Sequence, residues 1–109
     1  MTLRAILDRQ VHLTNNRDLD GLADQYCDDA ILLRFDAESV GKRAIREFYK
    51  GYLEREPETL SIDAYTEAEE MLSYKSKIVL GGKQIKTYGI WIVRNGKIWR
   101  EFAGVAGEP

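Results

Sequence analysis

Two charged residues directly follow an apolar strand pattern, and charges in such a place can do acid–base chemistry. Arg34 and Asp36 close the segment "AILLRFD". Residues two apart in a strand share a face, so both charged side chains lie on the same side as Leu32. The pattern leaves two interpretations open. Either the pair reaches water at a sheet edge, or it lines a cavity that the apolar residues enclose.

A third candidate, Glu101, lies near the end of the chain in the segment "KIWREFAGVA". Asn95-Gly96 is a strong hairpin signal, and the register of a two-residue loop there pairs Ile90 with Glu101. Directly opposed residues share a face, so Ile90 and Glu101 lie on one face, and the same register places Trp99 on it as well. Both faces of this hairpin are largely apolar. We therefore expect one face to meet the helices and the other to meet a second subunit.

The Gly81-Gly82 turn decides which face is the inner one. A two-residue loop would place Tyr74 on the same face as Trp91 and Arg100. A three-residue loop that includes the next lysine places Tyr74 with Glu101 instead. Glycine-bearing three-residue loops are common in hairpins, and we favour this form. It leaves Trp91 and Arg100 on the outer, subunit-facing side of the sheet.

These residues must be positioned by helices that precede a run of strands. Apolar spacing and capping residues predict helices over residues 2–15, 19–26 and 42–55. Alternation and turn signals predict strands over residues 30–35, 59–68, 71–80, 83–94 and 97–106. The order indicates an α+β fold. We expect a cone-shaped α+β barrel, with three N-terminal helices packed on a strongly curved, mainly antiparallel sheet, as one domain over residues 1–109.

Composition excludes several classes of function. The chain has 109 residues and a formal net charge of −2, which provides no electrostatic footprint for nucleic acid or an acidic membrane. No apolar run is long enough to span a membrane, and the N-terminus has charges where a signal peptide needs an apolar core. One cysteine, Cys27, fits a reducing, cytoplasmic location. With His12 the only histidine, we expect no metal site and no cofactor.

Three segments carry a resemblance to a known family. They are "NNRDLDGLADQYCDDAIL", "GKRAIREFY" and the terminal "NGKIWREF". Together they resemble the SnoaL-like branch of the nuclear-transport-factor-2-like superfamily, which includes the steroid delta-isomerases. The resemblance covers the whole chain and implies a cystatin-like cone with a deep apolar pocket, usually dimeric through the outer sheet face. It also implies that the first strand lies against the pocket, so that Arg34 and Asp36 point inward.

The chain departs from the steroid isomerases at their catalytic positions. Their general-base aspartate falls on Arg34, and their oxyanion-hole tyrosine falls on Gln10. Their second oxyanion acid falls near Ile90 or Trp91. Only Tyr49 matches a pocket tyrosine of that group. Steroid isomerisation is therefore not expected. The segment "WREF" also resembles the "WRDY" segment of limonene-epoxide-hydrolase-type members, whose Trp and Asp face the pocket.

The prediction that follows is a pocket for a small, mainly apolar organic molecule. Glu101 or Asp36 would serve as a base there, and Arg34 would polarise the substrate, in a lyase, isomerase or hydrolase reaction. The expected pocket residues are Gln10, Tyr49, Tyr74, Tyr88, Ile90 and Trp99. Two alternatives stay open. Arg34 and Glu101 could form a plain structural ion pair, and the protein could be a non-catalytic carrier or sensor, or a dimeric interaction module.

Overall fold

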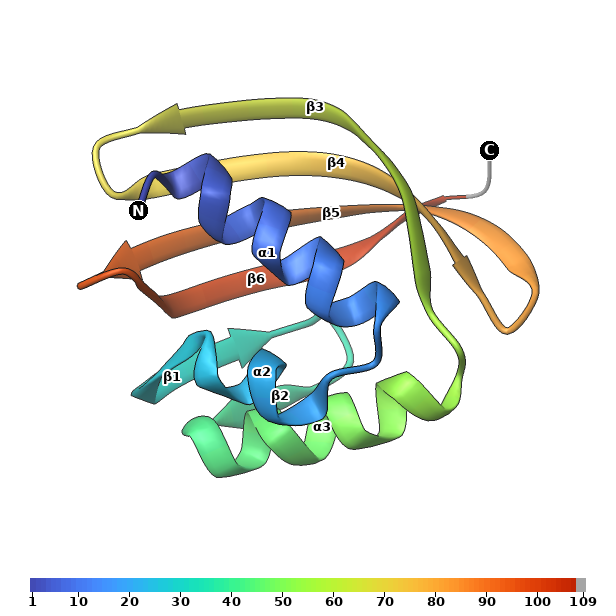
Figure 1. Cartoon of the computed structure of the whole chain (residues 1–109), viewed down its shortest axis with the longest axis horizontal. Helices are drawn as coiled ribbons and strands as arrows, with labels where there is room; N and C mark the ends of the chain where they lie inside the picture. The colour runs from blue at the N-terminus through green and yellow to red at the C-terminus, as the bar shows by residue number, and fades with distance from the viewer. Residues whose placement is uncertain (108–109) are drawn as a thin grey trace.

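The computed structural model describes residues 1–107 and contains three helices and six strands. The helices are α1 (Leu3–Asn15), α2 (Leu19–Asp24) and α3 (Lys42–Glu54). The strands are β1 (Tyr26–Leu33), β2 (Glu38–Val40), β3 (Glu58–Ala68), β4 (Met71–Leu80), β5 (Lys83–Arg94) and β6 (Lys97–Gly107). Figure 1 traces them from the N-terminal helix, in blue, to the last strand, in red.

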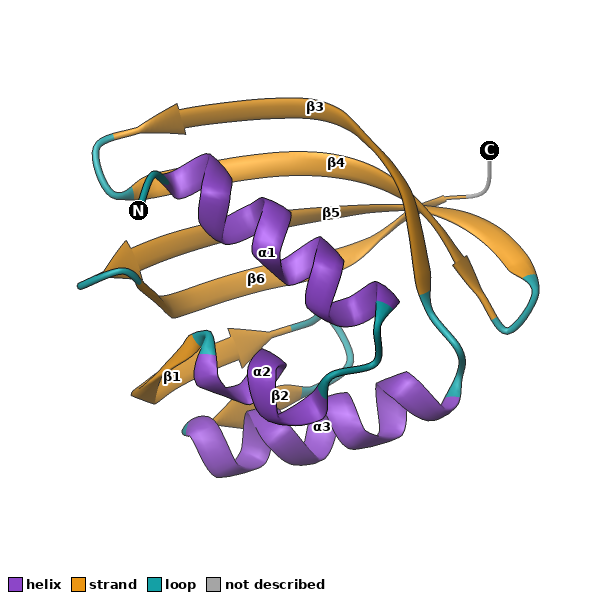
Figure 2. Ribbon diagram, in the orientation of Figure 1, coloured by secondary structure: helices purple, strands orange, loops and turns teal. Residues whose placement is uncertain are grey.

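All six strands form one sheet, in the order β2-β1-β6-β5-β4-β3. Neighbouring strands are antiparallel except for β1 and β6, which are parallel. The long strands β3 to β6 curve around α1, while α2 and α3 lie beside β1 and β2 (Figure 2). The predicted α+β class, with three helices on a strongly curved sheet, is confirmed.

Local chemistry sets the helix limits much as the sequence predicts. The Thr2 side chain caps α1 by accepting a hydrogen bond from the Ala5 amide, and Asp18 caps α2 by accepting one from Gly21. The second helix is shorter than expected, because it ends at Asp24 and β1 already begins at Tyr26. The change places Tyr26 in the core rather than on a helix.

The turn at residues 81 and 82 differs from our expectation. Leu80 pairs directly with Lys83, so the loop has two residues and not three. Both glycines have positive φ, 59° for Gly81 and 82° for Gly82. Two successive positive φ values are what the tight type I′ hairpin turn requires, and glycine adopts them without a steric penalty. Consecutive glycines therefore favour the shorter loop.

The second hairpin contains a bulge that the sequence pattern did not predict. Arg94 pairs with Lys97 as expected, but Ile92 pairs with Arg100, so Trp99 is an extra residue on β6. A bulge shifts the register by one residue, and each later side chain then pairs with the next neighbour. Glu101 consequently lies opposite Trp91 and not opposite Ile90.

The shorter glycine turn and the bulge at Trp99 each shift the strand register by one residue. Residues separated by both shifts keep their predicted face relative to each other, whereas residues separated by only one shift change face. Tyr74 and Glu101 share the inner face, as predicted, because the two one-residue shifts cancel. Trp91 was expected on the outer face but is fully buried in the core, whereas Ile90 is 43% exposed on the outer face.

Candidate functional site

A cavity of about 110 Å³ lies between the helices and the inner face of the sheet. Five aromatic side chains contribute to its wall: Phe48, Tyr49, Tyr52, Tyr74 and Tyr88. Within the described chain, Glu101 and Arg34 are the only charged residues that line it. The cavity is thus an apolar, aromatic space with one acid and one cation, which is a typical composition for a small-molecule site.

Glu101 is a buried acid, 6% exposed, on the inner face of β6. Burial raises the pKa of its carboxyl from 4.5 to about 7, because the charged form loses its hydration. Three neighbours partly offset this effect. A hydrogen bond from the Tyr26 hydroxyl to Oε1 lowers the pKa, and so do the Trp91 indole and the positive charge of Arg34. Glu101 can therefore exchange a proton near neutral pH.

A chain of buried hydrogen bonds ends on this carboxylate. The Gln25 amide donates to Gln10 Oε1 over 3.3 Å, and the Gln10 amide donates to the Tyr49 hydroxyl over 2.9 Å. The Tyr49 and Tyr26 hydroxyl oxygens are 2.6 Å apart, and Tyr26 donates its proton to Glu101. Tyr26 has a single proton and gives it to Glu101, so Tyr49 must donate to Tyr26. Every donor in the chain thus points toward the acid.

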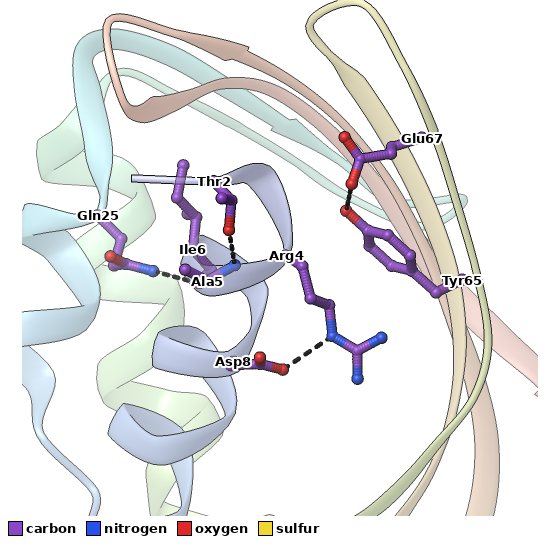
Figure 3. A network of polar contacts seen from close by, with 8 residues as sticks. All are labelled: Thr2, Arg4, Ala5, Ile6, Asp8, Gln25, Tyr65 and Glu67. Carbon is purple, nitrogen blue, oxygen red and sulfur yellow. Dashed lines mark hydrogen bonds and ion pairs between the residues drawn. The ribbon is translucent and has the colours of Figure 1, made fainter.

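The far end of the chain is anchored on the first helix. The Gln25 side-chain amide also donates to the backbone oxygen of Ile6 over 3.0 Å (Figure 3). An amide group held by two acceptors has a fixed orientation. Gln10, which lies on α1, is in turn oriented by Gln25. The helix packing therefore sets the direction of the whole donor chain.

The tyrosines remain protonated, as donors must. Burial is the main cause that raises the pKa of both Tyr26 and Tyr49 well above the ordinary value of 10, and the charge of Glu101 raises both further. Tyr74, which also lines the cavity, has a raised pKa for the same two reasons. The cavity wall therefore offers hydroxyl donors and a single proton acceptor, Glu101, that changes charge near neutrality.

Trp91 packs beside the acid without a hydrogen bond of normal geometry. Its ring lies edge-on to Tyr74 at 5.7 Å, and it faces Glu101 across the β5–β6 pair. Among residues 1–107 its indole N–H is the one buried side-chain polar atom without a partner. The N–H is nevertheless close enough to lower the pKa of Glu101. A small movement of Trp91 would supply a second donor to the ionised carboxylate.

Arg34 lies where the cavity meets solvent. Its side chain is 27% exposed, lines the cavity, and packs its guanidinium 5.3 Å from the centre of the Phe48 ring. Asp36, its partner at 3.8 Å, is 83% exposed and is not a lining residue. The inward orientation expected for Arg34 fits this geometry. The inward orientation expected for Asp36 does not, because the turn after β1 carries it to the surface.

The structure brings together most of the predicted site residues, but not all. Gln10, Tyr49, Tyr74, Arg34 and Glu101 all line the cavity. Tyr88 borders it as well, although its ring packs against Phe102.

Two predicted pocket residues do not line this cavity, and both lie on the outer face. Ile90 is one of them, and Trp99 is the other. The guanidiniums of Arg94 and Arg100 flank the Trp99 ring at 3.6 and 3.8 Å. Both corrections follow from the bulge at Trp99 and the shorter glycine turn, which reverse the alternation.

The residues of the site that were missing from the sequence-based prediction include Tyr26, Gln25 and Tyr52. Tyr26 was assigned to the end of a helix, where its contact with β6 could not be anticipated. The sequence signal that could have identified Tyr26 is its position shortly before "DDA" in the segment "NNRDLDGLADQYCDDAIL", which carries part of the family resemblance. Tyr52 lies on α3 and lines the cavity, but it was not among the expected pocket residues. Gln25 carries no pattern that distinguishes it from a surface glutamine.

Residues 1–107 contain no group of three or more potential metal ligands. No helix within this range has the length and apolar character needed to cross a membrane.

No protein-family model and no curated protein matches the chain. Similar solved structures exist, however. An NTF2-like protein of unknown function from Cytophaga hutchinsonii has a TM-score of 0.83 and 12% identity, and the match covers 96% of this chain and 90% of that one. An LEH-like epoxide hydrolase from M. tuberculosis has a TM-score of 0.75 and 13% identity, with 93% and 80% covered.

A third similar structure is a de novo designed protein with a curved β-sheet. Its TM-score is 0.79 at 16% identity, and the match covers 96% of this chain and 88% of the design. The three matches include an enzyme, a protein of unknown function and a design, so the shared fold does not select a function. What they establish is architecture: the chain has the nuclear-transport-factor-2-like fold that its sequence resemblance predicted.

Proposed function

We propose that this protein binds a small, mainly apolar organic molecule in the cavity and that Glu101 acts on it as a general acid–base group. One observation carries the proposal. Glu101 is the only acid among the described lining residues, is buried, and has a pKa of about 7. A group of this kind accepts and returns protons near neutral pH, which is what general acid–base catalysis requires.

The surrounding residues suit this role. Ionised Glu101 would take a proton from a carbon or hydroxyl of the ligand and hold it on a carboxyl oxygen. The tyrosine hydroxyls of the wall, Tyr52 and Tyr74, are donors for an oxygen that gains negative charge. Arg34 would polarise the ligand from the mouth of the cavity. Isomerases and lyases that remove a proton from carbon share this first step, whereas in a hydrolase Glu101 would take the proton from the water that attacks the ligand.

Hydrogen–deuterium exchange tests the role in an isomerase or lyase, because it follows the proton that Glu101 removes from carbon, and the same spectra would show the product formed by a hydrolase. Ligands that stabilise the protein in a thermal-shift screen would be incubated with it in D₂O and followed by NMR. We expect exchange at an activated position of the ligand, and Glu101→Gln should slow it about 10²–10⁴-fold while binding is retained.

The matched control is Glu47→Gln, which neutralises an exposed acid on α3 that does not line the cavity. This variant should exchange at the rate of the wild type. Equal exchange by wild-type protein and Glu101→Gln would contradict the catalytic role. In that case ligand stabilisation with no chemistry would favour the alternative, a carrier or sensor built on the same cavity.

A further inference from the structure

The electrostatics of the cavity indicate which class of molecule it takes. We propose that the ligand is a small organic carboxylate with a single ring, or an apolar part of similar size, whose carboxylate binds the guanidinium of Arg34. The inference rests on the proposed function, because it names the kind of molecule on which Glu101 would act. It goes further by fixing the charge, the size and the orientation of that molecule.

The charge follows from the lining residues. Arg34 is the only cation among the described residues that line the cavity. A guanidinium binds a carboxylate through two parallel hydrogen bonds, and such charge-assisted pairs are about twice as strong as neutral ones. The hydroxyls of Ser76 and Thr87, elsewhere in the wall, are 2.6 Å apart and bond to each other. Arg34 is therefore the strongest polar contact still open to a ligand.

Arg34 is held in place but weakly paired. Its guanidinium lies over the Phe48 ring, and this contact restricts the long side chain. Its ion pair with Asp36 spans 3.8 Å and involves a carboxylate that is largely in water. Exposed ion pairs of this kind contribute little to the free energy of unfolding. A ligand carboxylate at the cavity mouth can therefore replace Asp36 at small cost and gain the bidentate contact.

The size follows from the volume of the cavity. A dry apolar cavity of about 150 Å³ in another protein binds benzene. The present cavity is about 110 Å³ and has an aromatic wall, so it suits a ring or a branched chain of comparable dimensions. A four-ring steroid would not fit in it. With its carboxylate on Arg34, such a ligand would direct its apolar part toward Tyr74 and Glu101.

The proposal also predicts how binding depends on pH. A bound carboxylate would repel the ionised form of Glu101, and burial already raises the pKa of Glu101 to about 7. Ligand binding and proton uptake by Glu101 should therefore favour each other. The affinity for a carboxylate should fall as pH rises through about 7, and Glu101→Gln should remove this decline.

Three probes of matched size test the inference: benzoate, benzamide and benzyl alcohol. Calorimetric titration at about pH 6, where benzoate is ionised and Glu101 is largely neutral, should show benzoate binding about 10-fold or more tightly than either neutral probe. Arg34→Met should abolish that preference, and Arg34→Lys should retain part of it. Arg43→Met, which removes an exposed arginine of α3 that does not line the cavity, should leave it unchanged.

The outcomes separate this inference from the proposed function. Neutral probes that bind as tightly as benzoate, or a benzoate preference that persists in Arg34→Met, would overturn the carboxylate inference and leave the binding function standing. Failure of all three probes to bind would overturn the inference and count against a ligand cavity altogether. Thermal unfolding of each variant checks that a lost preference does not reflect a lost fold.

Discussion

At the scale of single residues, Glu101 is subject to two opposing effects. Burial favours its neutral form, whereas the donor chain through Tyr49 and Tyr26 favours its charged form. Burial is the larger effect, so the pKa lies near 7 and not near 4.5. A purely structural acid gains nothing from this balance, whereas a group that exchanges protons near neutrality needs it.

The raised pKa predicts a definite dependence of stability on pH. Between about pH 4.5 and 7, the folded protein holds a proton on Glu101 that the unfolded chain has already lost. The free energy of unfolding should therefore fall as pH rises through this range, by about 3 kcal/mol in total, and this contribution should be constant above it. Urea unfolding of wild type and Glu101→Gln at a series of pH values isolates the effect. The free energy of unfolding of the variant should increase relative to that of wild type from about pH 4.5 to 7. Parallel curves of unfolding free energy against pH for the two proteins would show that Glu101 titrates normally.

The donor chain predicts the effect of removing one hydroxyl. Tyr26→Phe deletes the hydrogen bond that Glu101 accepts, so the pKa of Glu101 should rise above about 7. Carbon-13 NMR of the glutamate carboxyl groups follows this titration directly. In Tyr65→Phe, the matched control, the lost hydroxyl contacts Glu67 far from the site, and the pKa of Glu101 should not change. An unchanged titration in Tyr26→Phe would mean that the donor chain does not act on the acid.

At the scale of secondary-structure elements, the sequence is most informative where turn chemistry is simple. Asn95-Gly96 predicts its hairpin correctly, with positive φ at both residues. The bulge at Trp99 cannot be detected from the alternation of apolar and polar residues, because Trp99 and its neighbours are apolar or amphipathic and are compatible with either face of the sheet. Since a one-residue shift reverses every later side chain, Ile90 and Trp99 were misplaced together. Tyr26 was misassigned for another reason: its burial depends on β6, which is remote in sequence.

Two glycine substitutions test how the strands shape the cavity. A Cβ at Gly89 would lie 2.6 Å from atoms of the Tyr74 ring, which is too close for any carbon contact. Gly89→Ala should therefore displace Tyr74 and destabilise the fold by about 1–3 kcal/mol. Gly51→Ala, in the exposed middle of α3 with open space around it, should stabilise by roughly 0.5–1 kcal/mol. Denaturant unfolding compares them, and a neutral Gly89→Ala would show that Tyr74 is not fixed against β5.

At the scale of the whole molecule, the outer face of the sheet stands out. Leu33, Phe102 and Ile90 are directly aligned across β1, β6 and β5. A second row contains Ile31, Arg100, Ile92 and Met71. Several of these apolar side chains are exposed, as is Phe35, which packs edge-on against Phe102. Exposed apolar side chains that are contiguous across neighbouring strands are typical of protein–protein interfaces.

We propose that a second copy of the chain covers this outer face, because the apolar side chains of these rows can pack on the same side chains of the other copy around a two-fold axis. Light scattering after size exclusion should give the mass of a dimer, and Ile90→Lys should give that of a monomer, since a charge would then be buried at the interface. Leu60→Lys changes a similarly exposed leucine of β3 that belongs to neither row, so this variant should remain dimeric.

The cavity opens on the other side of the sheet, so monomeric Ile90→Lys should still bind its ligand. A monomeric wild type at micromolar concentration would leave the apolar rows without this explanation and would contradict the proposal.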